Sequence, residues 1–421
     1  MNEENAIKDK RKSINLKEIL FDNIVTILFV ILCLIGVKYS GQPMIFILNE
    51  LIARISRNSF LVLSLIIPVL AGMGLNFGIV IGAMAGQIAL IAVTHWKIGG
   101  IQGFLLCAVL TVPIAVLFGY LTGKLLNKTK GQEMIASMIL GFFANGLYQL
   151  LFLFLIGTLI PMNNPVLVLS GGVGIKNTID LSGGIKYALD NIVKFPMLDV
   201  IVVISIISIL YILFKGAKSK KITKKQIIDL SIFLVIGIVS ILLIQYQPIF
   251  KMIKVPVVTI LVVALLCIFN VFIMKTKLGQ DFKAVGQDNH VAKVSGIAVD
   301  KIRIISIVIS TVFAGWGQLI FLQNLGTLNT YGSHEQVGMF AIAALLIGGA
   351  SVSRATISQA IIGTILFHTL FIVSPQAGKN LLGSAQIGEY FRVFVAYGVI
   401  GLSLGLHAWK KQIQGKNKLK V

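Results

Sequence analysis

Long apolar runs recur along almost the whole chain, and they decide the solvent in which it folds. Hydrophobic residues make up 56% of the 421 residues and charged residues only 13%, with a mean hydropathy of +0.91. A soluble domain needs more polar and charged residues than this to cover its surface. Lipid must therefore surround much of the chain, and we expect an all-α, polytopic integral membrane protein.

The apolar runs approach the length of a membrane-spanning helix, which needs about 20 apolar residues. They lie at residues 19–37, 60–74, 76–94, 101–121, 134–160, 197–214, 227–244, 255–274, 303–322, 338–352, 355–373 and 391–408. Two runs are short, and the stretch 60–94 is broken by the sequence AGMGLNFG. We therefore expect about 10–12 transmembrane helices, including broken or half-spans, within residues 19–408.

Basic residues lie mainly in the short gaps between the runs. Lys and Arg number 37 against 16 Asp and Glu, which gives a net charge of +21. With the N-terminus inside, alternating sides place 26 of the 37 in inside segments and 10 in outside segments, the positive-inside pattern of membrane proteins. This pattern predicts attraction to membrane lipid and argues against binding of nucleic acid.

The same orientation assigns each segment to one side of the membrane. Residues 1–18 are a cytoplasmic leader to a retained helix, because no small-residue cleavage site precedes a short apolar core. Residues 409–421 form a basic cytoplasmic tail, so both termini face the cytoplasm. Residues 275–302 form a cytoplasmic loop, whereas residues 161–196 form an extracytoplasmic loop long enough to be functional.

Most motifs of enzymes and metal sites are missing from the sequence. It holds no phosphate-binding GxxxxGK loop followed by Ser or Thr, no HExxH and no paired Cys/His spacing, and its one GxSxG match, GLSLG at 401–405, lies inside the apolar run 391–408. The three cysteines lie inside apolar runs, and the five histidines are scattered. We therefore expect no catalytic residues, no bound metal and no cofactor on this chain.

Uncharged polar residues and small residues interrupt the apolar runs. Glycines recur at every fourth position from Gly74 to Gly86, which permits close approach of helices. Seven polar or aromatic residues are candidates for lining a substrate pathway: Asn76, Gln87, Asn145, Gln149, Trp316, Gln318 and Gln359. Such groups suit a neutral, hydroxyl-rich solute, because acids for a proton relay are nearly absent from the runs. Plain helix packing is the alternative for each of them.

One polar segment between two runs, KAVGQDNHVAKVSGIAVDKIR at residues 283–303, predicts a short helix on the cytoplasmic side. Asp288 or Asn289 can cap its start, and Gly296 supplies a stop. Between them, Val291, Ala292 and Val294 form a small apolar face. Such a helix suits docking in a groove of another protein, and an ordinary connecting loop is the alternative.

The stretch AVGQDNHVAKVSGI resembles the cytoplasmic coupling loop of ATP-binding-cassette importer permeases of the branched-chain amino acid, simple sugar and nucleoside group. The residues that match the family pattern in register are Ala284, Val285, Gly286, Ala292, Gly296 and Ile297. Asp288 replaces the usual asparagine, and Val291 replaces the first of two paired alanines. An aspartate can still cap a helix, so the substitution leaves the expected role intact.

Other stretches extend this resemblance over nearly the whole chain. LNFG at 75–78 and GQEMIASMILGFF, which contains Glu133 and Ser137, are similar to motifs of nucleoside-type permeases. The usual acidic residue and Gly-Gln after the first motif are missing at Val80 and Ile81. IAALLIGGASVSRATISQAIIGTIL is more similar to sugar permeases. The motifs that mark the solute class are therefore mixed.

The resemblance implies a transmembrane permease domain at 19–408, part of an importer in a bacterial cytoplasmic membrane. Its coupling residues would be Ala284, Val285, Gly286, Asp288, Val291, Ala292 and Gly296. They would dock separate ATPase subunits, which carry ATP and Mg. A second permease chain, identical or related, and an extracytoplasmic solute-binding protein complete the expected partners. A nucleoside or simple sugar is the expected solute; a branched-chain amino acid importer and a secondary, ion-coupled transporter are the alternatives.

Overall fold

Helices dominate the computed structural model, which describes residues 23–219 and 224–418. The helices are α3 (Ile24–Ser40), α4 (Met44–Ser64), α5 (Ile66–Leu70), α6 (Ile79–His95), α7 (Gly100–Lys128), α8 (Glu133–Leu150), α9 (Met197–Ser219), α10 (Lys224–Tyr246), α11 (Val257–Ile273), α12 (Lys277–Gln287), α13 (Asn289–Val294), α14 (Val299–Leu325), α15 (Ser333–Ile347), α16 (Ile357–Leu382) and α17 (Ala385–Lys418). A π-helical turn, η1 (Leu151–Leu155), continues α8, and a 3-10 turn, η2 (Pro248–Met252), follows α10. The all-α, polytopic fold expected from the sequence is confirmed.

Within the described ranges, seven helical segments are long and apolar enough to cross a membrane, or eight if the bent pair α11 and α12 is one span. The seven are α4 with α5, α7, α8 with η1, α9, α10, α14 and α16. Three shorter apolar helices, α3, α6 and α15, coincide with the predicted runs at 19–37, 76–94 and 338–352. The last predicted run lies within α17. Full and partial spans therefore occur together, as the interrupted runs indicated.

The second span begins earlier than its apolar run predicted. The run starts at residue 60, but α4 begins at Met44. Charged residues such as Glu50 and Arg54 interrupt the apolar pattern in this first half. They form an ion pair one helical turn apart, with 3.6 Å between Glu50 Oε2 and Arg54 Nε. Paired charges of this kind let a helix near the membrane surface carry polar residues.

Glycines hold α6 and α14 at backbone contact. A Cβ added at Gly82 would lie 2.5 Å from the carbonyl oxygen of Thr311, and one at Gly86 would lie 2.5 Å from that of Gly315. Small residues allow this approach in lipid, where van der Waals packing and not water exclusion holds helices together. The predicted close approach is therefore confirmed at Gly82 and Gly86.

Two glycines of the sequence AGMGLNFG, residues 71–78, have a different role. Gly72 and Gly74 adopt φ values of +73° and +68°, a left-handed conformation that favours glycine. They lie in the non-helical segment 71–78 between α5 and α6, which we name the break. The break ends the second span and starts the short helix α6.

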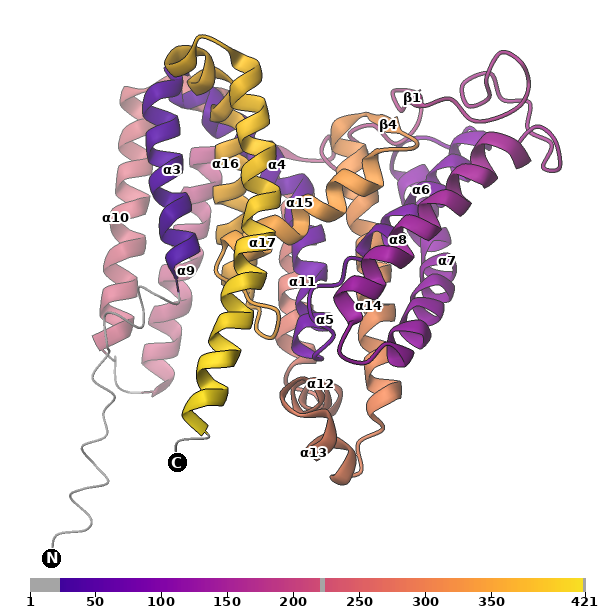
Figure 1. Cartoon of the computed structure of the whole chain (residues 1–421). Coiled ribbons are helices and arrows are strands. Elements are labelled where there is room, and N and C mark those ends of the chain that lie inside the picture. Colours follow the sequence, from indigo (N-terminus) through magenta and orange to yellow (C-terminus); the bar gives the residue numbers. More distant parts are fainter. Residues whose placement is uncertain (1–22, 220–223, 419–421) are drawn as a thin grey trace, which may run out of the picture.

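Two small sheets tie loops together at one end of the molecule. Strand β1 (Thr178–Asp180) pairs antiparallel with β4 (Thr327–Asn329), with Ile179 opposite Leu328. Strand β2 (Lys194–Pro196) pairs with β3 (Lys254–Pro256) in the same sense. The pair β1 and β4 lies at the opposite end from α12 and α13, and α3 begins and α17 ends towards the α13 end (Figure 1).

A buried carboxylate fastens the long loop at the β1 end. Asp190, only 2% exposed, accepts hydrogen bonds from Thr259 at 2.5 Å, Gln323 at 2.9 Å and Asn324 at 2.6 Å. These donors come from α11 and α14, so the loop is bound to two spans. A buried charge needs such a set of partners to offset its desolvation.

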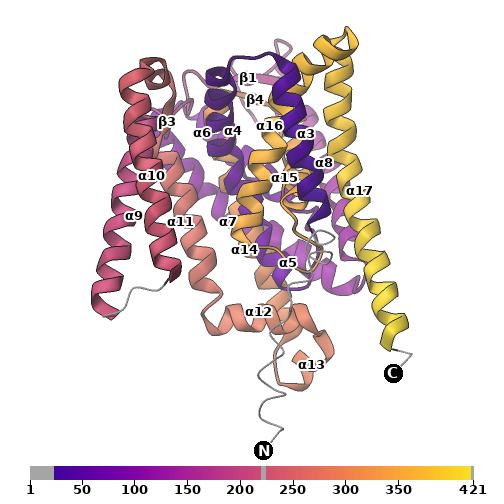
Figure 2. The same ribbon diagram turned by 90° about the vertical axis from the view of Figure 1, so that its left-hand side faces the viewer.

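Helices α9 and α10 form a hairpin beside the rest of the protein (Figure 2). In the apolar 18-residue stretch of each helix, only 11% of α9 and 6% of α10 is buried, against 72% for α4 with α5 and 61% for α14. The hairpin therefore presents apolar side chains outward on most sides, whereas α4 and α14 form the core.

The backbone contact at Gly86 predicts a clear asymmetry between two helical glycines. Gly86→Ala should lower the stability of the detergent-purified protein by about 1–3 kcal/mol, because the added methyl group overpacks the α6–α14 contact. Gly146→Ala on α8 is the matched control, since nothing lies within 4 Å of its Cβ position. Thermal unfolding measures both; equal melting temperatures for the two variants would contradict the contact.

Candidate coupling surface and polar network

Helices α12 and α13 project beyond the spans at one end of the molecule (Figures 1 and 2). The chain bends by 76° between α11 and α12, which turns it out of the direction of the spans. Thr276 caps α12, because its side chain accepts a hydrogen bond from the Gly279 N–H at 3.3 Å. Helix α12 was not predicted, since its polar sequence contains no apolar run.

The cap and the stop predicted for α13 are confirmed. Asp288 Oδ1 accepts hydrogen bonds from the N–H groups of Val291 at 3.0 Å and His290 at 2.7 Å. These donors hold the pKa of Asp288 below its ordinary value, because they stabilise the charged carboxylate. Gly296 follows the helix with φ +82°, a conformation that ends a helix at low cost for glycine.

The apolar face predicted for α13 was wrong in one residue. Val291 and Val294 are exposed by 60% and 78%, whereas Ala292 is buried at 2%. Residues three apart share a face of a helix, but neighbouring residues point about 100° apart. Ala292 therefore anchors α13 to the protein, and the two valines form the outward apolar surface, which we name the valine pair.

Helix α12 rests on the break with no side chain between the two backbones. A Cβ added at Gly286 would lie 2.1 Å from the carbonyl oxygen of Leu70, and one at Gly72 would lie 2.9 Å from the Cα of Gly286. Val285 is buried at 1% and Ala284 packs partly buried against the core. Both segments stand out in the sequence, but no sequence pattern indicates that they touch.

A network of polar side chains joins α6, α8 and α15 inside the protein. Gln87 Oε1 accepts a hydrogen bond from the Tyr148 hydroxyl at 2.9 Å and lies 3.0 Å from His334 Nδ1. His334 Nε2 lies 2.9 Å from Asn145 Oδ1, and the Asn145 amide donates to Glu335. Gln87 and His334 are fully buried. We name these five residues the polar network.

The polar network contains two of the seven residues predicted for a pathway, Gln87 and Asn145. His334, which links them, is one of five histidines scattered along the sequence. It lies far from both in sequence, and no spacing pattern connects them. The buried amide nitrogen of Gln87 has no partner among the described residues, so the network keeps one free donor.

The remaining predicted residues lie elsewhere, and two of them fasten turns. Asn76 accepts a hydrogen bond from Gly78 N–H at 3.0 Å in the break, and Gln359 donates to the Gly349 carbonyl at 2.7 Å between α15 and α16. Gln149 is half-buried beside Tyr148 on α8. Gln318 is fully buried on α14, and neither atom of its amide has a partner among the described residues. The structure does not bring these four into the network.

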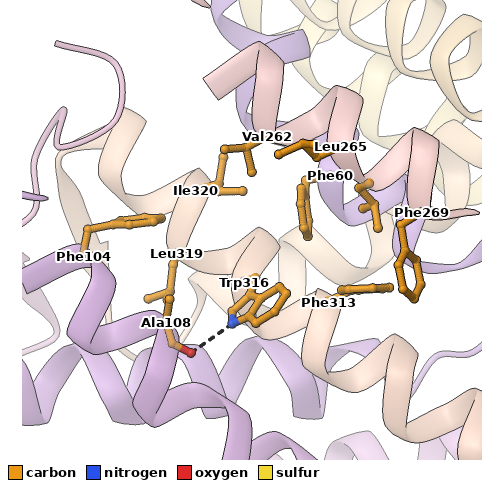
Figure 3. Close-up of a pocket in the computed structure, with 11 residues that line it drawn as sticks. Phe60, Phe104, Ala108, Val262, Leu265, Phe269, Phe313, Trp316, Leu319 and Ile320 are labelled. Carbon is orange, nitrogen blue, oxygen red and sulfur yellow. Dashed lines mark hydrogen bonds between the residues drawn. The ribbon is translucent and has the colours of Figure 1, made fainter. Parts of the chain in front are cut away.

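Trp316 lines an aromatic cavity of about 410 Å³ between α4, α7, α11 and α14 (Figure 3). Its indole N–H donates to the Ala108 carbonyl at 3.0 Å. The cavity wall is otherwise apolar, with four phenylalanine rings: Phe60, Phe104, Phe269 and Phe313. Within residues 23–219 and 224–418, no group of three or more His, Cys, Asp or Glu residues could hold a metal ion.

Comparison with known proteins gives one family and two partial relatives. A family model described as branched-chain amino acid transport system / permease component matches residues 47–403. A xylose transport system permease protein of Haemophilus influenzae is 29% identical over 154 residues, 36% of this chain and 39% of the relative. A probable ABC transporter permease protein of Sinorhizobium fredii is 33% identical over 122 residues, 29% of this chain and 35% of the relative.

The chain therefore spans well under half the length of the curated relatives that it matches. No solved structure matches it.

The capping of α13 predicts a local effect of Asp288. Asp288→Ala should speed amide hydrogen exchange across Asn289–Val294, because two N–H groups lose their acceptor. Ser295→Ala is the control, since its hydroxyl donates to the Val291 carbonyl at 2.9 Å and caps no N–H. Hydrogen exchange with mass spectrometry measures both; unchanged protection in Asp288→Ala would contradict the cap.

The same cap should depend on pH in a defined direction. The pKa of folded Asp288 is lowered, so its stabilising effect is complete above the pKa of an unstructured aspartate. It is lost as the pH falls through the lower, folded-state pKa.

Proposed function

This chain belongs to the ATP-binding-cassette permease family of branched-chain amino acid transport systems, and we propose that it forms the membrane pathway of an importer. The observation that carries this proposal is the valine pair, displayed on a capped helix beyond the spans. Exposed apolar residues on a short, rigid helix fit a groove in a partner protein. We propose that the partner is an ATPase subunit, which carries the ATP and Mg.

The proposed orientation places α13 in the cytoplasm of a bacterium, together with the termini. The excess of Lys and Arg in the inside segments supports it. An extracytoplasmic solute-binding protein would then meet the opposite end, where β1, β4 and the Asp190-bound loop lie. A second permease chain, identical or related, would complete the pathway, and membrane lipid would cover the α9–α10 hairpin.

The polar network is the proposed place of solute recognition within this pathway. Its amide, phenol and imidazole groups donate and accept hydrogen bonds in a dry environment, where each bond has a large effect on selectivity. The unpaired Gln87 amide nitrogen leaves a donor for a solute oxygen. A nucleoside or simple sugar is the proposed solute, and the similarity to a xylose permease protein supports a sugar.

Two alternatives remain distinct from this proposal. A branched-chain amino acid as solute is favoured by the description of the family model. An ion-coupled secondary transporter would need acids within the spans that exchange protons or ions. The buried Asp190 and the network residue Glu335 are held by neutral donors within the protein, an arrangement that supports fixed structural roles.

The valine pair predicts a specific loss of partner binding. Val291→Asp with Val294→Asp should abolish co-purification of the ATPase subunit with a tagged chain, because two carboxylates cannot enter an apolar groove without a large desolvation cost. Val173→Asp, at an exposed valine in the opposite loop, is the matched control. Equal recovery of ATPase with both proteins would refute docking through α13.

The polar network predicts a loss of uptake without loss of assembly. His334→Leu should lower solute uptake by about tenfold or more, because the ring that joins Gln87 to Asn145 is lost and the Asn145 oxygen loses the ring nitrogen that faces it. Gln149→Leu, on α8 beside the network, should change uptake less. The assay is accumulation of labelled xylose, uridine or leucine by cells expressing the assembled importer. Accumulation of leucine alone would favour the amino acid alternative.

A further inference from the structure

Arg303 is the largest fully buried side chain among the described residues, and it carries a charge. It lies near the start of α14, directly after the segment that contains α13. Its Nη2 is 2.5 Å from Oε1 of Glu133, the first residue of α8, and its side chain is 1% exposed. Removing one partner of a buried ion pair is costly, but replacing both partners by apolar side chains often leaves the stability of a protein unchanged or raises it. Stability alone therefore does not explain why this position is ionic.

The ion pair also contacts the break. Arg303 Nε lies 2.9 Å from Met73 Sδ, in the middle of the break. Arg303 is thus held between the first turn of α8 and the segment on which α12 rests. A single guanidinium can bridge two elements in this way because it has five donors in a fixed plane.

The first turns of α8 touch the break at two further points. The Phe77 N–H donates to Ser137 Oγ at 3.2 Å, and a Cβ added at Gly74 would lie 3.1 Å from the Met134 side chain. On its other side the break meets Gly286 of α12 through backbone atoms. The contacts therefore run without interruption from α12, through the break, to the start of α8.

Helix α8 leads from this contact to the polar network. It begins with Glu133 and carries Asn145 and Tyr148 near its other end. A continuous helix moves as a rigid unit over such a length, so a shift at Glu133 reaches Asn145.

We propose that the Arg303–Glu133 pair is a positioning element that keeps α8 in register with the break, so that movement of α12 and α13 reaches the polar network. This inference rests on the proposed function, because it needs an ATPase that moves α13. The pair takes no part in docking, since the valine pair lies on the outward side of α13. Loss of the pair should therefore leave the ATPase bound and disconnect α8 from it.

The test replaces the pair by apolar residues, Arg303→Met with Glu133→Leu, which avoids leaving one charge buried alone. A second ion pair supplies the matched control. Lys130 Nζ lies 3.1 Å from Asp300 Oδ1 and joins the α7–α8 loop to the start of α14, but both side chains are more than half exposed. The control variant is Lys130→Met with Asp300→Leu.

The readout is the rate at which N-ethylmaleimide labels a cysteine introduced on α8 by Ala144→Cys, followed by mass spectrometry of its peptide. Each complex is purified with its ATPase and labelled with and without ATP and vanadate. We expect nucleotide to change the rate roughly fivefold or more in the parent and in the control. In Arg303→Met with Glu133→Leu the change should be lost, while the amount of co-purified ATPase stays the same.

The possible results separate this inference from the proposed function. A nucleotide response of parental size in the apolar pair variant would overturn the inference, and so would a parent whose α8 does not respond. Absence of any ATPase with the parent would overturn the proposed function and the inference with it. If the apolar pair does not fold, Arg303→Met with Glu133→Gln removes both charges and keeps an acceptor for Gly131 N–H, and the same outcomes apply.

Discussion

The backbone contact between Gly286 and the Leu70 carbonyl is the constraint on which the arrangement of this protein depends. No side chain can be inserted there, so α12 and the end of the second span must move together or separate completely. Packed contacts of this kind do not deform gradually. Because of this contact, the position of α12 outside the spans fixes the position of the break. The helix pair that carries the valine pair is therefore in direct backbone contact with the break.

Lipid explains why the protein builds such contacts from glycine and from paired polar groups. Apolar side chains gain nothing by leaving hydrocarbon for a helix interface, so close packing and hydrogen bonds must hold the spans together. The α6–α14 contact uses the first means, at Gly82 and Gly86. The Asp190 cluster and the polar network use the second. Both kinds of contact are specific in geometry, which fixes one arrangement of helices.

Local features were predictable from the sequence, and contacts between distant segments were not. The apolar runs, the cap at Asp288 and the stop at Gly296 each depend on neighbouring residues, and all three are present. The first half of α4 was missed because its charged residues interrupt the apolar pattern, although they are paired within the helix. His334 and Arg303 were missed as partners because a single sequence does not reveal which remote residues they meet. Only Gln87 and Asn145 of the predicted pathway residues join the network.

Burial indicates which helix can respond to a movement of the break. The apolar 18-residue stretch of α8 with η1 is 17% buried, whereas that of α4 with α5 is 72% buried and that of α14 is 61% buried. Shifting a helix costs least where few packed contacts must be broken, and within this chain α8 has far fewer of them than α4 and α14. The two ends of α8 meet the break and the polar network. Helix α8 is therefore the element that joins these two sites with the fewest packed contacts to the spans α4 and α14.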